Sequence, residues 1–158
     1  MNGPERAGNA LPSSDISPII RGPYERLVIA AAIKSFNRPA TDLQLSRAFA
    51  IEAARLASET RGHNVKVLDV AGISPITDFF VLVTGTSARQ MRAVADQIEE
   101  FARERDFKPN SISGYEGTNW ILVDCVDVVI HIFTLESRAY YDLDNLWGDA
   151  KPVEWETK

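Results

Sequence analysis

Carboxylates near the ends of predicted β-strands are the side chains of this chain that could most readily do chemistry. Asp69 ends one predicted strand, and Asp124 and Asp127 flank the turn between two others. Carboxylates that converge on shared metal ions would suit nucleotidyl transfer. Positions three apart, however, lie on opposite faces of a continuous strand, and across a turn they cap it instead. Asp69 and Asp78 are alternative partners, but local backbone hydrogen bonding explains each equally well. The spacing therefore favours structural roles over metal-dependent transfer.

A second candidate is the turn Gly85-Thr86-Ser87, which joins an apolar strand to a predicted helix. Free backbone N–H groups at a helix N-terminus suit an anion. The turn matches neither a P-loop nor a Gly-x-Gly-x-x-Gly fingerprint. We therefore interpret it as a capped turn with Thr86 or Ser87 as the N-cap. A nucleotidyltransferase or other nucleotide-binding enzyme that uses this turn is the alternative function.

Cysteine and histidine offer little further chemistry. The single cysteine, Cys125, rules out an internal disulfide, and with only His63 and His131 beside it no zinc spacing exists. Cys125 lies among acidic neighbours, whereas a reactive thiol needs positive surroundings. His131 lies in an apolar strand without a paired nucleophile, so we expect a half-buried structural histidine. We predict no catalytic residue, no metal and no cofactor.

Composition limits the class of protein further. The chain has 158 residues, 45% of them hydrophobic and 25% charged, with a net charge of −5. This is ordinary for a globular protein. A general nucleic-acid binder would show a basic stripe, so any ribosomal or RNA-associated role should go through protein contacts, without sequence-specific nucleic-acid recognition. No apolar run is long enough to span a membrane, and the first 20 residues fit a secretory or transit peptide poorly. We expect a cytoplasmic protein.

The chain divides into a leader, one domain and a tail. Prolines at four positions between residues 1 and 23 predict that 1–40 is disordered or at most loosely helical. Thr41-Asp42-Leu43-Gln44 matches a capping box and predicts that the domain begins there and extends over 41–149. Residues 150–158 form a tail without periodicity.

Helical and strand periodicities alternate along the domain. We expect helices from Thr41 to about Thr60, with Gly62 as its C-cap, along the apolar stripe from Met91 to Ala102, and over Glu136–Leu146. We expect strands at Val65–Val70, Phe79–Thr84, Trp120–Asp124 and Val128–Phe133. This order predicts an α/β fold, a small mixed sheet flanked by helices.

An acidic and aromatic segment stands out near the C-terminus. Between Glu116 and Ala150 there are seven acidic residues and one basic residue, Arg138, together with two tryptophans and two tyrosines. Complementary charge steers encounter, and aromatic side chains carry affinity. The segment therefore predicts a binding surface for a basic partner, with at least one aromatic exposed. The tryptophans and tyrosines are Trp120, Tyr140, Tyr141 and Trp147.

Taken together, the motifs closely resemble those of the ribosomal silencing factor family (RsfS, also called Iojap), from about Leu45 to Trp147. The combined pattern is specific, although each motif alone is weak. The residues that carry it are Asp69, Ile76-Thr77-Asp78, Thr84-Gly85-Thr86-Ser87, Gly114, Glu116-Gly117, Trp120, Asp124, Asp127, His131, Glu136-Ser137-Arg138, Tyr141, Leu143 and Leu146-Trp147.

The resemblance implies a nucleotidyltransferase-like fold without enzymatic activity. It also implies binding to the large ribosomal subunit, through its protein number fourteen, which blocks joining of the small subunit and lowers translation when nutrients are short. A role as a large-subunit assembly adaptor and a homodimeric state stay open. The positions that match the family's partner-contacting surface, or lie near it, are Trp120, Asp124, Asp127, Arg138, Tyr141 and Leu143.

Overall fold

The computed structural model describes residues 43–107 and 109–156, and all structural statements below concern these residues. The leader and the capping box at Thr41 lie outside them. The elements, in chain order, are α3 (Leu43–Glu59), β1 (His63–Asp69), β2 (Phe79–Thr84), α4 (Ala88–Glu104), β3 (Ser111–Ser113), β4 (Trp120–Asp124), β5 (Val128–Phe133), α5 (Leu135–Tyr141), α6 (Leu143–Leu146) and β6 (Lys151–Pro152).

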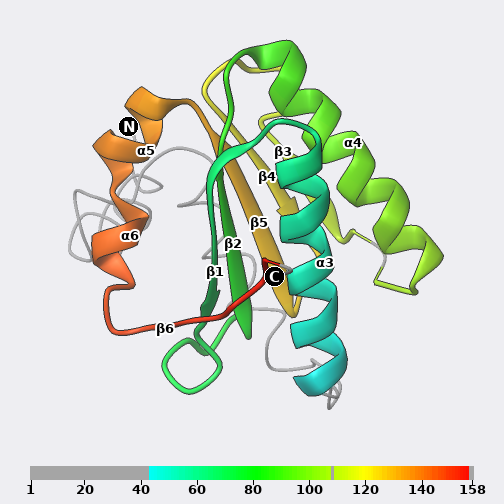
Figure 1. The fold of residues 1–158 in the computed structure, drawn as a ribbon, viewed down its shortest axis with the longest axis vertical. Coiled ribbons are helices and arrows are strands. Elements are labelled where there is room, and N and C mark those ends of the chain that lie inside the picture. The colour runs from blue at the N-terminus through cyan, green and yellow to red at the C-terminus, as the bar shows by residue number, and fades with distance from the viewer. Residues whose placement is uncertain (1–42, 108, 157–158) are drawn as a thin grey trace, which may run out of the picture.

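The described strands form one mixed sheet of six strands in the order β3-β4-β5-β2-β1-β6. β2 and β5 pair in parallel at its centre, and every other neighbouring pair is antiparallel. α3 and α4 cover one face, while α5 and α6 lie on the other side of the sheet (Figure 1). The predicted α/β fold, a small mixed sheet flanked by helices, is confirmed.

The two central strands are apolar because both of their faces are covered. Every residue of β2 and β5 is buried. Alternate residues belong to two separate cores, because successive side chains of a strand point to opposite faces. Val81 packs with α3 and α4, whereas Phe80 and Leu82 pack on the side of α5 and α6. An unbroken apolar run therefore predicts a strand buried on both faces, as found.

Small side chains bring α3 close to the sheet. Its buried face is mostly alanine around Phe49, so the helix lies near the strands. α3 ends at Glu59, and the left-handed residue that follows it is Arg61, with φ 71°, and not Gly62 as expected. Gly62 instead donates its N–H to the carbonyl of Ala57 at 2.7 Å, and a Cβ on Gly62 would lie 2.6 Å from Cγ1 of Val83. Gly62 is thus needed for close packing, and the left-handed position belongs to Arg61.

The last predicted helix is two helices. Asp142 adopts φ 51° and ends α5, so α6 starts in a new direction. Within the described residues the structure also adds β3 and β6, which no clear alternation indicates.

The segment beyond residue 150, expected to be a tail, packs against the domain. β6 pairs with β1, Val153 is buried, and the indole N–H of Trp155 donates to the carbonyl of Val65 at 3.2 Å. The chain then reaches α3, where Arg55 donates to the Trp155 carbonyl at 3.0 Å (Figure 1). The C-terminal residues therefore tie the edge strand β1 to α3.

Candidate protein-binding surface

The carboxylates considered for metal binding lie far from the turn that would hold a nucleotide. Asp69 pairs with Phe79 at the start of β2, and Asp124 pairs with Val129 near the start of β5. The turn at Gly85 follows the other end of β2, roughly 16 Å away at about 3.3 Å per residue. No group of three His, Cys, Asp or Glu side chains that could hold a metal ion occurs among the described residues. The arrangement that metal-dependent transfer at this turn requires is not formed by these residues.

The same carboxylates serve the local backbone. Asp69 accepts a hydrogen bond from the N–H of Ala71 at 3.1 Å. Asp124 accepts from the N–H of Val126 at 2.8 Å and so holds the turn before β5, where Val126 has φ 70°. The backbone carbonyl of Asp127 accepts from Phe79 at 3.1 Å and links this turn to β2. The interpretation of Asp69 and Asp124 as turn-capping residues is confirmed.

The start of α4 is capped by its own side chains. Ser87 accepts from the N–H of Gln90 at 3.1 Å, and the Gln90 side chain accepts from the N–H of Thr86 at 3.0 Å. The pair resembles a capping box, except that Gln90 accepts from Thr86, the residue before the N-cap. Two of the amides that an anion would need are therefore already engaged, and the expected capped turn is confirmed with Ser87 as the N-cap.

Burial makes His131 and Cys125 poor groups for catalysis. His131 is fully buried, not half-buried as expected, and burial followed by the nearby charge of Arg138 lowers its pKa to about 3. It is therefore neutral at pH 7. Burial also raises the pKa of the Cys125 thiol to about 12, and the charge of Asp124 adds to this shift. A thiol with that pKa supplies almost no thiolate nucleophile at neutral pH.

Aromatic rings gather on the side of the sheet that carries α5 and α6. The Trp120 ring lies 4.5 Å from Tyr141 and 5.2 Å from Phe133, centroid to centroid. Trp120 is 4% exposed and Tyr141 is half-buried. Leu143, which opens α6, is 1% exposed and belongs to the same core. Trp120 and Leu143 therefore expose little surface, and they form part of the core against which Tyr141 packs.

The predicted site residues fall into two places. Trp120, Arg138, Tyr141 and Leu143 lie around α5 and α6. Asp124 and Asp127, both buried, lie at the far end of the β4–β5 hairpin. Asp124 is four residues from Trp120 along β4, about 13 Å, on the same face of the sheet. One protein partner covers roughly 800 Å² and could span this distance.

The most exposed large side chains of this region were missed as site residues by sequence reasoning. Tyr140 is 71% exposed and Leu135 is 69% exposed, both on α5, and Leu146 on α6 is also exposed. Tyr140 meets Tyr141 edge to face at 4.9 Å between centroids. The expectation of an exposed aromatic in the acidic segment is thus met by Tyr140. A spacing of five between Leu135 and Tyr140 was the only signal, and it is too weak to identify an exposed pair.

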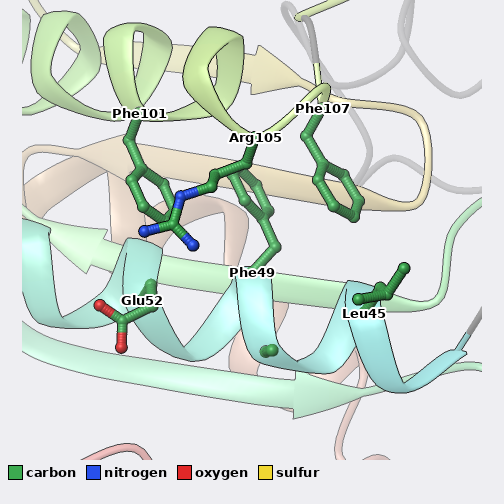
Figure 2. Close-up of a pocket in the computed structure, with 7 residues that line it drawn as sticks. Leu45, Phe49, Glu52, Phe101, Arg105 and Phe107 are labelled. Carbon is green, nitrogen blue, oxygen red and sulfur yellow. The ribbon is translucent and has the colours of Figure 1, made fainter.

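A separate hollow opens on the opposite side of the sheet. It has a volume of about 180 Å³, and Phe49, Phe101 and Phe107 line it between α3 and the end of α4 (Figure 2). Phe49 stacks on both other rings, and the Arg105 guanidinium lies 4.8 Å from the Phe101 centroid. None of the predicted site residues lines this hollow. It therefore lies apart from α5 and α6.

Residues 44–158 match the family model described as "Ribosomal silencing factor during starvation". The chain belongs to the ribosomal silencing factor family. The ribosomal silencing factor RsfS of Halalkalibacterium halodurans is 39% identical over 104 residues, which are 66% of this chain and 89% of that protein. The chloroplastic protein Iojap of Arabidopsis thaliana is 33% identical over 139 residues, which are 83% of this chain and 55% of Iojap.

A solved relative has the same fold. The crystal structure of a Chromobacterium violaceum protein is 28% identical, covers 75% of this chain and 95% of its own, and superposes with a TM-score of 0.62. The family match runs past residue 150, so it includes β6 and the buried Val153 of this chain. Among the described residues of this family member, no helix is both long and apolar enough to cross a membrane.

Proposed function

We propose that this silencing factor binds the large ribosomal subunit through its protein number fourteen and prevents joining of the small subunit, which lowers translation when nutrients are short. In this proposal the chain acts by occupying a surface and catalyses no reaction. Its place of action is the cytoplasm, where it meets ribosomal subunits. Family membership supports the ribosomal role, since related proteins are named ribosomal silencing factors.

The observation that carries the binding site is the exposed α5–α6 surface. We define this surface by its accessible residues Leu135, Tyr140, Tyr141 and Leu146. Exposed aromatic and aliphatic side chains close together mark protein-binding sites. Four acidic residues lie among or close to them in the sequence, namely Glu136, Asp142, Asp144 and Asp149. Such a surface suits a basic ribosomal protein, because apolar anchors give affinity and opposite charges steer the encounter.

Five of the six residues expected at the partner take different parts in the proposal. Tyr141 contacts the partner directly, and Trp120 and Leu143 hold it in place from the core. Asp124 and Asp127 extend the acidic region along β4 and β5, where Lys or Arg of the partner could pair with them. Their burial limits this contribution to the rim of the footprint.

Binding of the purified full chain to isolated ribosomal subunits tests the proposal. We expect co-sedimentation with large subunits and not with small subunits, and direct binding to isolated protein number fourteen. Absence of binding to large subunits would refute the proposed function. Binding to large subunits without binding to protein number fourteen, with crosslinks from Tyr140 to another protein, would refute the choice of partner.

A further inference from the structure

Arg138 is buried at the junction of four elements. It is therefore not the surface contact that the sequence predicted. It is 5% exposed. Its Nη1 donates to the carbonyl of Asn64 at 2.6 Å and to Oγ1 of Thr84 at 2.9 Å. Its Nε and Nη2 each donate to one oxygen of Asp144 at 3.0 Å. The guanidinium thus joins α5 to β1, β2 and α6.

The contact with Asp144 fixes the direction of α6. A two-oxygen pair with a planar guanidinium allows one relative orientation of the two side chains. Arg138 and Asp144 stand on either side of Asp142, the residue with φ 51° at which α5 ends. Lys66 of β1 donates to the same carboxylate at 3.0 Å. The angle between α5 and α6 is therefore fixed by the contact between the two helices and by contacts with β1 and β2, and not by hydrogen bonds inside either helix.

We propose that Arg138 is a positioning residue, which touches no partner but sets the angle between α5 and α6 and thereby the arrangement of Tyr140, Tyr141 and Leu146. This inference rests on the proposed function, because it concerns the same α5–α6 surface. The surface consists of two short helices with few turns of their own, so its shape depends on this junction. A surface held in its binding shape loses less entropy on binding.

Lysine cannot replace this arginine. The four donor contacts point to three different elements, and a single ammonium on a flexible stem cannot make them together. The pKa of Asp144 is consistent with this close contact. Partial burial alone would raise the pKa, but hydrogen bonds from Arg138 and Lys66 lower it to about 2. Asp144 is therefore ionised at neutral pH.

The test compares Arg138→Gln and Arg138→Lys with the wild-type chain in binding to large subunits over a range of salt concentrations. Arg103→Gln is the matched control, because Arg103 is an exposed arginine that pairs with Glu99 on α4, across the sheet. Affinity is measured for the folded fraction only, so that a loss of stability alone does not change it. Amide exchange is followed over residues 135–147 and, as an internal reference, over β5.

We expect Arg138→Gln to weaken binding about tenfold and to speed amide exchange within residues 135–147. The salt dependence should be at least as steep as that of the wild type, because the loss of this positive charge leaves Asp144 unpaired beside a basic partner. Arg138→Lys should give a smaller loss in the same direction, and it replaces the glutamine variant if that one does not fold. Arg103→Gln should bind as the wild type does. Wild-type affinity in both Arg138 variants would overturn the inference.

A second outcome would also overturn it. If Arg138 contacted an acidic group of the ribosome directly, its removal would make binding less dependent on salt. If the wild-type chain itself ignored large subunits, the proposed function would fail and the inference with it. Wild-type binding together with unaffected Arg138 variants would overturn the inference alone.

Discussion

The indole N–H of Trp120 donates a hydrogen bond to Nδ1 of His131 at 3.2 Å, inside the core beneath α5 and α6. The acceptor role of Nδ1 requires that this nitrogen carries no proton. Phe80 packs edge-on against the same imidazole at 5.2 Å between centroids. His131 is therefore neutral and belongs to the core against which Tyr141 packs.

This relationship predicts a pH dependence of folding stability. The unfolded chain binds a proton at His131 near pH 6.5, whereas the folded chain does so only near pH 3. Between these values the unfolded state holds more protons, so the free energy of unfolding should decrease as the pH falls, by up to about 1.4 kcal/mol per pH unit. Above pH 6.5 His131 should contribute no pH dependence.

Urea unfolding of the wild type and of His131→Phe between pH 3.5 and pH 8 measures this effect. The variant loses the Trp120 contact and starts less stable at pH 7, but its stability should change less between pH 6.5 and pH 4. His63→Gln, at an exposed histidine, should keep the wild-type slope. Parallel curves for the wild type and His131→Phe would contradict the prediction.

Two glycines provide a matched pair for backbone strain. Gly114 has φ 76°, and a Cβ there would lie 2.1 Å from the carbonyl oxygen of Trp120. Gly114→Ala should therefore lower the free energy of unfolding by roughly 2 kcal/mol or more. Gly72 has open space around its Cα, so Gly72→Ala should change stability by less than about 1 kcal/mol. Thermal or urea unfolding measures both, and equal effects would refute the assignment of strain.

The C-terminal residues should stabilise the whole domain. Val153 lies in the core and donates its N–H to the Val67 carbonyl at 2.8 Å, and Trp155 packs on the same core. Replacing both Val153 and Trp155 by alanine should lower the free energy of unfolding by about 3 kcal/mol or more. Glu154→Ala, at the exposed residue between them, is the control and should have little effect. If the double variant unfolded at the same urea concentration as the wild type, the C-terminal segment would contribute little to the stability of the domain.

Tyr140 should be an anchor for the ribosomal partner. Because it is exposed, Tyr140→Ala should leave the fold intact and weaken binding to large subunits by about 2 kcal/mol, roughly 30-fold. Leu45→Ala is the matched control, since Leu45 is an exposed apolar residue on α3 beside the separate hollow. Equal losses for both variants would show that the α5–α6 surface is not the binding site. Trp120→Ala is less informative, because it removes a buried ring and should destabilise the core by about 3 kcal/mol or more.

The sheet was predictable because its strands have strong local signatures. The bounds of β2, β4 and β5 match the expected ranges, since each is an apolar run whose ends are marked by turn residues. The break at Asp142 was not predictable, because the residue that holds it, Arg138, acts through β1 and β2, 74 and 54 positions away in sequence. β6 is only two residues long, and burial of Val153 keeps it in place.

The character of the surface was easier to predict than its members. Charge and aromatic content predicted an acidic binding region between Glu116 and Ala150, and within that segment side chains of α5 and α6 are exposed; binding there is our proposal. Composition could not tell that Arg138 and Leu143 are buried while Leu135 is exposed. That division depends on which side of a seven-residue helix meets the sheet, and so short a helix has too few turns to show a periodicity.

The most direct measurement is subunit joining in the presence of this protein. Purified large and small subunits are mixed at a magnesium concentration that favours association, and joining is followed by light scattering with increasing amounts of the chain. We expect the wild type to reduce joining in proportion to its occupancy of the large subunit, and Tyr140→Ala to require a much higher concentration for the same effect. Full joining at saturating occupancy of the large subunit by the wild-type chain would contradict it.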